Sequence, residues 1–333
     1  MKNLKAAVIG LGVGEQHIRS YQSIEGIEIT AICDVDSERL KEVGDQYNIG
    51  CRETDYRRLT EDPDIDVISI CSFDNFHAEQ AISAFLHEKH VMIEKPVALF
   101  RPDVEAILRA QQDSKRLISS NLILRQSPRF IEVKHRIGAG ELGDIFYMEG
   151  DYIHQIIHKL TVGWRGKMDF YSVVYGGGIH LIDLMRWLAG DEVESVTGMG
   201  NDRLVRGSSY QYYDSAVSLL RFQNGAIAKN FTTLGPQHPF FHSLKVFGTE
   251  ATFVNQLGDG DWYCDDVPEN REAMAQPYPG MEKGDLLPDF INAIRSGRQP
   301  NVSATDVFRV MDICLAVHES IETGQPVKIN YLY

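Results

Sequence analysis

The chain has 333 residues, of which 43% are hydrophobic and 24% are charged, the composition of a globular protein with a sizeable core. This length exceeds that of a typical single domain and favours two domains. The formal net charge of −14 argues against nucleic-acid binding, because phosphate contacts need clustered lysines and arginines. No apolar run reaches the ~18 residues that a membrane-spanning helix needs, so we expect no membrane partner.

The cysteines and the start of the sequence indicate the cellular compartment in which we expect the protein. Five cysteines without CxxC spacing argue against a disulfide framework and against a zinc site. The first apolar run follows Met-Lys-Asn directly and leaves no room for a signal peptide. We therefore expect a cytoplasmic protein without a bound metal.

A glycine-rich loop follows the first apolar run. Residues 6–9 predict a buried strand that ends in Gly10-Leu11-Gly12-Val13-Gly14 and passes directly into a helical pattern. Gly10 permits a tight turn, Gly12 lets a diphosphate approach the backbone, and the N–H groups that open the helix face the anion. The third glycine stands one place early, with Glu15 in its usual position, which predicts a shorter loop. Surface turns also use glycine, but a strand before and a helix after the loop favour a dinucleotide site.

A second apolar run, residues 27–33, bears on the choice of dinucleotide. It ends at Asp34, near the spacing at which an acidic residue meets a ribose 2′-hydroxyl. A 2′-phosphate beside this carboxylate would meet a like charge, at a cost of up to ~4 kcal/mol at ~4 Å. Val35-Asp36-Ser37 offers no cation to offset that cost. The sequence therefore predicts a preference for NAD(H) over NADP(H).

Apolar runs and helical patterns alternate up to about residue 120, which is typical of a parallel sheet with crossover helices. We expect helices over 37–47, 55–60, 75–86 and 103–114, and strands over 67–71, 90–93 and 116–120. Ligands bind outside the carboxyl ends of the strands in such sheets. Polar or glycine-rich segments follow four of the strands: 10–14, Asp34, 72–77 and 94–96. We expect these segments to gather at one edge of the sheet.

Two polar residues after the fourth strand are predicted to lie on the cofactor side together with Ser72. They are Asn75 and His77. Asn75 also stands where a residue would cap the helix that follows, and a cap does not exclude contact with a cofactor.

Beyond about residue 122 the pattern changes to an α+β domain with a mostly antiparallel sheet. We expect helices over 130–137, 178–188, 285–296 and 304–322, and strands over 144–152, 195–199, 215–222, 226–231 and 243–247. Asn224-Gly225 predicts a hairpin between two of these strands. The polar segment 258–279 is predicted to be a long loop. The expected domains are thus 1–122 and 123–333, with the C-terminal helices as candidates for packing back on the first domain.

Across essentially its whole length, the sequence resembles the glucose–fructose oxidoreductase, inositol dehydrogenase and rhizopine-catabolism (Gfo/Idh/MocA) family. The resemblance rests on AVIGLGVGEQH, Cys33-Asp34-Val35-Asp36, the segment 71–77, Glu94-Lys95-Pro96, the helix segment 178–184 and Gly324-Gln325-Pro326-Val327. Its most specific part is Glu-Lys-Pro combined with His-x-x-Asp on a helix about 85 residues later.

This resemblance implies an α/β Rossmann domain that holds a nicotinamide cofactor, and an α+β domain whose large, open, mostly antiparallel sheet holds a sugar or cyclitol. It implies a homodimer or homotetramer built through that sheet. The expected cofactor contacts are Gly10, Leu11, Gly12, Val13, Gly14, Asp34, Ser72, Asn75, His77, Glu94 and Lys95. The expected substrate contacts are Lys95, Arg165, Tyr175, His180 and Asp183.

Lys95 and His180 are the expected catalytic residues. A lysine at a strand end is often only a solvated charge, but Pro96 restricts the backbone here and helps to fix the side chain. An ammonium beside a hydroxyl stabilises developing alkoxide charge or shuttles a proton. His180 stands on an otherwise apolar helix, either as a buried histidine satisfied by Asp183 or as a proton donor and acceptor.

Position 176 departs from the family pattern. The family commonly places an aspartate four residues before the helix histidine, where this chain has Gly176. A Lys–Asp–His triad is therefore not supported. Lys95 and His180 act alone, or together with Asp169, Tyr171 or Tyr175.

Two further groups of residues carry weaker signals. His154 and His158 stand four residues apart, but Gln155 replaces the glutamate base of a metalloprotease, which favours a solvated or substrate-lining loop over a metal site. Four basic residues suit the phosphate or carboxylate of a nucleotide-linked sugar, or are scattered surface charges: Arg125, Lys159, Arg165 and Lys167.

The favoured function is an NAD-dependent oxidoreductase that transfers hydride between nicotinamide and a carbinol carbon of a sugar, cyclitol or nucleotide-linked sugar. Lys95 and His180 would handle the hydroxyl proton. Two alternatives remain: a non-catalytic regulator that binds NAD or a sugar, and an NAD-dependent glycoside hydrolase. The catalytic pair weighs against the regulator, since a sensor does not need it.

Overall fold

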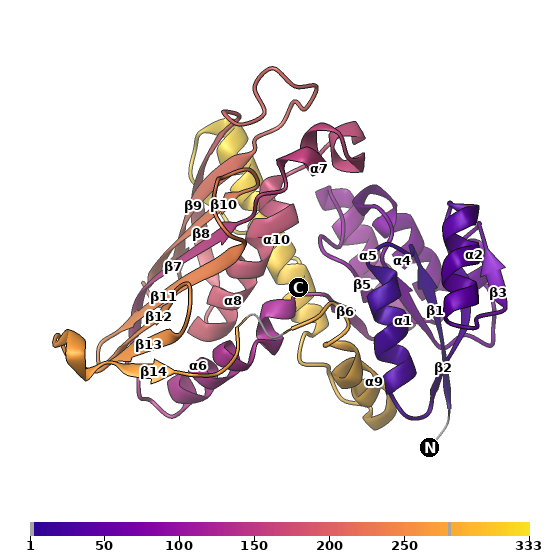
Figure 1. Cartoon of the computed structure of the whole chain (residues 1–333), viewed down its shortest axis with the longest axis horizontal. Helices are drawn as coiled ribbons and strands as arrows, with labels where there is room; N and C mark the ends of the chain where they lie inside the picture. Colours follow the sequence, from indigo (N-terminus) through magenta and orange to yellow (C-terminus); the bar gives the residue numbers. More distant parts are fainter. Residues whose placement is uncertain (1–2, 279–280) are drawn as a thin grey trace. The chain divides into compact units, whose positions relative to one another are not determined.

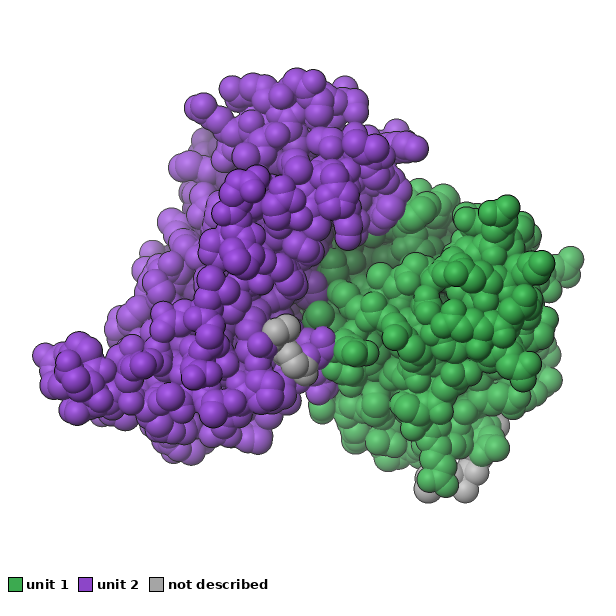
Figure 2. Space-filling model, viewed as in Figure 1, with its two compact units in different colours: residues 1–123, 282–309, 332–333 green, residues 124–281, 310–331 purple. Residues whose placement is uncertain are grey.

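The computed structural model describes residues 3–278 and 281–333. Contacts between Cα atoms divide these residues into two compact units, coloured separately in Figure 2. Unit 1 takes its residues from 1–123, 282–309 and 332–333, and unit 2 from 124–281 and 310–331.

Unit 1 is built on a parallel sheet of six strands in the order β3-β2-β1-β4-β5-β6 (Figure 1). Its strands are β1 (Leu4–Ile9), β2 (Ile27–Cys33), β3 (Cys51–Glu53), β4 (Val67–Ile70), β5 (His90–Ile93) and β6 (Ile118–Ser120). Its helices include α1 (Gly14–Ser23), α2 (Ser37–Gln46), α3 (Arg57–Thr60), α4 (His77–Leu86), α5 (Arg101–Ser114) and α9 (Leu287–Ser296). This is the strand order of dinucleotide-binding domains, and it confirms the predicted parallel sheet with crossover helices.

Local sequence explains where these elements begin and end. The central strands are mostly apolar and buried on both faces, as parallel strands are. The carboxylate of Asp36 caps α2 by accepting the N–H groups of Glu38 and Arg39. Helix α9 ends at Gly297, whose φ of 65° is left-handed.

A segment from the end of the chain completes unit 1. Helix α9 packs on α1 and β5, although the chain reaches it only after passing through unit 2. The boundary between the two units falls again inside α10 (Ala304–Thr323).

Unit 2 is built on a sheet of nine strands in the order β14-β13-β12-β11-β7-β10-β9-β8-β15 (Figure 1). Strands β7 and β10 pair in parallel, and the other described pairs are antiparallel, as predicted for this part of the chain. The strands are β7 (Ile145–Ile153), β8 (Val193–Asn201), β9 (Ser215–Phe222), β10 (Ile227–Thr233), β11 (Phe241–Gly248), β12 (Thr252–Asn255), β13 (Gly260–Tyr263), β14 (Glu272–Met274) and β15 (Val327–Lys328). Antiparallel β9 and β10 form the hairpin predicted around Asn224-Gly225.

Helices cover one face of this sheet (Figure 1). They include α6 (Pro128–Gly138) and α8 (Ile179–Ala189), and α8 is preceded by a π-helical turn, Val174–Gly178. The backbone before α8 approaches the sheet closely, because a β-carbon at Gly177 would lie 2.7 Å from the Tyr152 ring. Side chains on the opposite face are more exposed; Leu219, for example, retains 58% of its accessible surface.

The predicted loop over 258–279 is wrong in part. Strands β13 and β14 lie within it, and Trp262 of β13 is buried. Runs of three or four residues are too short for alternation to be visible, so pairing with β12 makes these strands. Pro279, the last residue of the predicted loop, lies outside the described residues. In the described part of the chain, no helix combines the length and apolarity needed to cross a membrane.

Candidate functional site

The three glycines of the loop after β1 meet different surroundings in unit 1. A β-carbon at Gly10, whose φ is 84°, would lie 2.5 Å from the Ser72 amide nitrogen. A β-carbon at Gly14 would lie 2.7 Å from the Val8 side chain, where α1 packs on β1. Exposed Gly12 has open space around the same position. Gly10 and Gly14 therefore serve the turn and the helix packing, and Gly12 leaves the room that a diphosphate needs.

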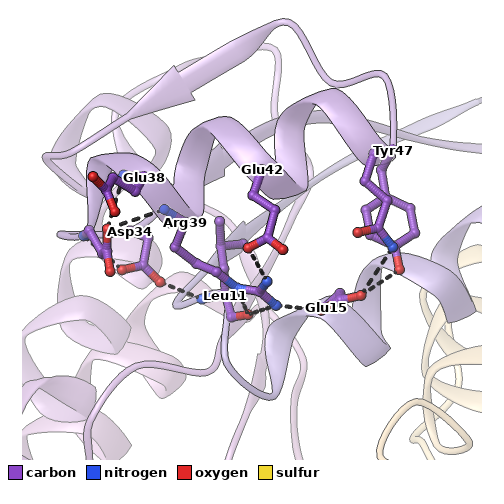
Figure 3. A network of polar contacts seen from close by, with 9 residues as sticks. Leu11, Glu15, Asp34, Glu38, Arg39, Glu42 and Tyr47 are labelled. Carbon is purple, nitrogen blue, oxygen red and sulfur yellow. Dashed lines mark hydrogen bonds and ion pairs between the residues drawn. The ribbon is translucent and has the colours of Figure 1, made fainter.

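Asp34 and Arg39 hold the backbone of this loop from two sides, as Figure 3 shows. The Asp34 carboxylate accepts the Leu11 N–H at 2.7 Å and the Asp36 N–H at 2.9 Å. The Arg39 guanidinium donates to the Leu11 carbonyl at 3.2 and 3.3 Å. The prediction that no cation lies near Asp34 considered only residues 35–37 and was incomplete, because the first turn of α2 brings Arg39 to the loop.

His77 and Asn75 differ in what they contact. His77 is fully buried, and its ring nitrogens lie 2.7 Å from the Pro96 carbonyl and 3.2 Å from the Ser72 carbonyl. It therefore joins the segments that follow β4 and β5. Asn75 is exposed within a short 3₁₀ turn, and α4 begins after Phe76 without a side-chain cap, so the capping interpretation of Asn75 is wrong.

A buried polar cluster surrounds Glu94, the residue before Lys95. Its carboxylate accepts the Asn121 amide at 2.6 Å and lies 3.7 Å from the His17 ring. Burial alone would raise the pKa of Glu94, but Lys283, His17 and Lys95 together hold that pKa well below its usual range. The Lys95–Pro96 peptide is cis, and Lys95 is partly exposed. The sequence did not predict the roles of His17, Asn121 and Lys283, because they come from three distant segments.

In unit 2, His180 is buried on α8, one turn before Asp183. The two carboxylate oxygens of Asp183 accept hydrogen bonds from Arg125 at 2.8 and 2.5 Å, and both side chains are almost completely buried. Such a pair fixes α8, because breaking it would leave a buried charge. Arg125 was one of the four basic residues considered for binding a phosphate or carboxylate, and here its guanidinium is engaged by Asp183.

Tyr171 lies where a side chain at position 176 would lie. A β-carbon at Gly176 would overlap the Tyr171 hydroxyl, which explains in steric terms why this position is glycine. Tyr171 is buried, and the Arg165 guanidinium lies 5.9 Å from the centre of its ring. Tyr175 is also buried and packs against Phe170 and His318.

A group of aromatic and histidine side chains lies next to His180 in unit 2. The Tyr152 ring stacks on His180 at 6.1 Å, and the His242 ring meets His180 edge-on at 6.2 Å. The Tyr278 hydroxyl lies 2.5 Å from Nδ1 of His242, and the Tyr152 hydroxyl lies 3.1 Å from Nδ1 of His154. The sequence missed Tyr152, His242 and Tyr278: the pairing of β11 with β7 sets His242 beside Tyr152, and Tyr278 reaches His242 from a segment outside the strands.

His154 and His158 are placed differently. His154 joins the aromatic group, while His158 is exposed on the short helix α7 (Ile157–Thr161). Among the described residues, no group of three or more His, Cys, Asp or Glu side chains is arranged to hold a metal ion.

Two family models match the sequence. Residues 4–122 match a model described as the oxidoreductase family with an NAD-binding Rossmann fold. Residues 130–254 match the model of the GFO/IDH/MocA C-terminal domain. Together the two matches span most of the chain.

Individual proteins are similar over nearly the whole length. An uncharacterized oxidoreductase, YrbE of Bacillus subtilis (strain 168), is 26% identical over 347 residues, covering 99% of this chain and 98% of that protein. The myo-inositol 2-dehydrogenase of Thermotoga maritima is 25% identical, covering 98% of this chain and 99% of that protein. A solved structure of levoglucosan dehydrogenase in complex with NADH has the same fold, with a TM-score of 0.89, 22% identity and coverage of 99% and 100%.

Proposed function

Because the chain belongs to the Gfo/Idh/MocA family of oxidoreductases, we propose that it is a dehydrogenase that transfers hydride between NAD and a carbinol carbon. The substrate class is a sugar, a cyclitol or a nucleotide-linked sugar. The relatives named as inositol dehydrogenases support this class. The open space at Gly12, between two tightly packed glycines, is the observation that carries the proposal.

The residues of unit 1 fit a dinucleotide. Gly12 leaves room for the diphosphate, and the N–H groups that open α1 supply donors for it. Asp34 supplies a carboxylate for the ribose hydroxyls, which favours NAD(H) over NADP(H). Ser72, Asn75 and His77 complete the proposed contacts, His77 by joining the segments that carry Ser72 and Pro96.

The cofactor accepts or supplies the hydride, and the chain must handle the hydroxyl proton. We assign the proton to Lys95 and His180. The charged environment of Glu94 supports the ammonium form of Lys95, which stabilises an alkoxide. The Arg125–Asp183 pair fixes α8 and therefore the direction of His180. Contacts of Arg165, Tyr175 and Asp183 with the substrate stay predictions.

Tyr171 is the third polar group that we propose on the substrate side. Its hydroxyl lies against Gly176, four residues before His180, in the π-helical turn that leads into α8. A hydroxyl can donate and accept a hydrogen bond, so Tyr171 is able to orient the imidazole or a substrate hydroxyl. Of the three candidates from the sequence, we favour Tyr171 over Tyr175 and Asp169 for this reason.

Two further expectations stay proposals. The exposed face of the nine-stranded sheet, with Met199 and Leu219 more than half exposed, supports a homodimer or homotetramer formed through that sheet. All five cysteines are free, two of them exposed, which suits the reducing environment of the cytoplasm.

The test is a panel of polyols, free sugars and nucleotide sugars, each incubated with NAD and followed by the absorbance of NADH. We expect net reduction of NAD by at least one compound of the panel. NADH binding without any net reduction would contradict the dehydrogenase and favour a regulator or a glycoside hydrolase. The control is the same incubation with Lys95→Ala: any NADH that this variant still forms does not come from the proposed site.

A further inference from the structure

Arg39 is held by three partners at the edge of the glycine-rich loop (Figure 3). Its guanidinium donates to the Leu11 carbonyl, forms a close ion pair with Glu15, and lies 2.7 Å from a Glu42 oxygen. We call the Leu11 carbonyl, Glu15, Arg39 and Glu42 the Arg39 clamp. Arg39 is therefore held by Glu15 at the start of α1 and by Glu42 on its own helix, α2.

Glu15, the residue in place of the usual third glycine, is itself fixed. It accepts hydrogen bonds from the Tyr47 hydroxyl at 2.8 Å and from the Gln46 amide at 3.3 Å. The bond from Tyr47, helped by Arg39, outweighs burial and lowers the pKa of Glu15. Glu15 is therefore a charged and well-positioned partner for Arg39.

The clamp lies next to the carboxylate that the proposed function assigns to the ribose. Asp34 binds the N–H of Leu11, and Arg39 binds the carbonyl of the same residue. A guanidinium is well suited to bind phosphate through two parallel hydrogen bonds. Arg39 thus has the chemistry and the position to bind a 2′-phosphate, but two carboxylates already hold it.

We propose that Glu15 and Glu42 act with Asp34 as specificity-determining residues, by holding Arg39 on the loop and withholding it from a 2′-phosphate. This inference rests on the proposed dinucleotide site and adds the residues that set its selectivity. Two carboxylates, those of Glu15 and Glu42, hold this guanidinium, and a third, that of Asp34, lies on the N–H of the same Leu11, so the local charge opposes a phosphate.

A consequence separates this proposal from discrimination by Asp34 alone. Asp34→Asn removes one repulsive charge but leaves Arg39 in its clamp, so any gain for NADPH in this variant should persist when Arg39→Gln is added. Releasing the guanidinium requires the loss of charge at Glu15 and Glu42. The glutamines of Glu15→Gln and Glu42→Gln keep the shape of each side chain while weakening the hold on Arg39.

The experiment measures the Kd of NADPH and of NADH by fluorescence titration for the full-length protein and its variants. For Glu15→Gln/Glu42→Gln we expect the affinity for NADPH relative to NADH to rise about tenfold, the order of one charge-assisted bidentate contact. Adding Arg39→Gln to that variant should abolish the gain. The control is Glu38→Gln, an exposed carboxylate on α2 outside the clamp, for which we expect less than a twofold change.

Each outcome bears on a different claim. An unchanged NADPH-to-NADH ratio in the double variant, with NADH still bound, overturns the inference alone. A gain that persists without Arg39 also overturns it, because the effect would then be simple loss of negative charge. Failure of the unmodified protein to bind NADH overturns the proposed function, and the inference with it. If thermal unfolding shows that the double variant does not fold, Glu42→Gln alone, at a largely exposed position, removes one of the two carboxylates; we then expect a smaller gain for NADPH, which adding Arg39→Gln should again abolish.

Discussion

Lys95 follows Glu94, a buried glutamate whose negative charge is stabilised by the polar and charged side chains around it. The carboxylate of Glu94 is held by Asn121 and lies near His17, and the Lys283 ammonium favours its charged form. This charge in turn favours the ammonium form of Lys95, the form that can stabilise an alkoxide or give up a proton.

Lys95→Ala should lower turnover by about 10²-fold or more while NADH binding persists, in line with general acid–base contributions. Steady-state kinetics and a fluorescence titration of the same preparation measure the two quantities. Lys95→Arg is the matched variant, since it keeps the positive charge but does not deprotonate near neutral pH. Unchanged turnover in Lys95→Ala would remove this residue from the mechanism.

Tyr171→Phe and Gly176→Ala should impair the reaction through the same hydroxyl. The first removes it, and the second displaces it, because an alanine β-carbon would overlap the oxygen. We expect both to lower kcat about tenfold or more and to shift the pH–rate profile, with NADH binding unchanged. Gly138→Ala is the control, since a β-carbon there meets open space. A normal pH–rate profile in both variants would exclude Tyr171.

The sequence predicted the residues that follow one another in a motif and missed those that folding brings together. Gly10, Gly12 and Asp34 stand in a recognisable order, so their arrangement was predictable. Arg39 is five residues beyond Asp34, and only the direction of α2 shows that it reaches back to Leu11. His242 and Tyr278 come from distant segments, and no periodicity connects them.

At the scale of elements, the central strands of unit 1 were predictable because each is a short, mostly apolar run bounded by a polar residue or a glycine. The short strands β12 to β14 were not, because sheet pairing supplies most of their stability. The π-helical turn before α8 was missed for a similar reason: Gly177 and Gly178 fit against β7 and β10, a contact that the helical pattern does not reveal.

Strand β5 carries a histidine that should make unit 1 sensitive to acid. Burial and the nearby Arg116 lower the pKa of His90 to about 4, and Nδ1 of its ring accepts the Leu117 N–H at 3.1 Å. An unfolded histidine takes up a proton near pH 6.5, whereas His90 stays neutral in the fold. The stabilisation is therefore complete above pH 6.5 and decreases as the pH falls from 6.5 to about 4, by about 3 kcal/mol in total.

His90→Asn should remove most of this pH dependence, because asparagine keeps an acceptor for the Leu117 N–H but does not titrate. Urea unfolding at pH 7 and pH 5 gives the free energies to compare. His87→Asn, at an exposed position after α4, should leave the wild-type loss of stability at pH 5 unchanged. An equal loss in His90→Asn would mean that another group is responsible.

At the scale of the molecule, the more exposed face of the nine-stranded sheet mixes apolar and charged side chains. Leu219 is 58% exposed and stands opposite Lys229 on the neighbouring strand. Lys229 in turn forms ion pairs with Glu149 and Asp151 of β7. Such a surface combines area that favours burial with charges that can fix the register of a partner.

Leu219→Glu should disrupt the proposed oligomer, because it replaces exposed apolar area on this face with a charge that is costly to bury in an interface. Light scattering coupled to gel filtration should show a dimer or tetramer for the unmodified chain and a mass near the 37.6 kDa monomer for the variant. Leu86→Glu is the control, at a similarly exposed leucine that ends α4. A monomeric unmodified chain would contradict assembly through this face.

The late arrival of α9 has a consequence for biosynthesis. While a ribosome is still producing residues 124–281, the first unit lacks both the helix that packs on α1 and the lysine that secures Glu94. The nascent chain therefore carries an unfinished apolar surface until translation is nearly over. Polypeptides truncated before residue 282 should therefore fold poorly and bind chaperones more often than the full-length chain.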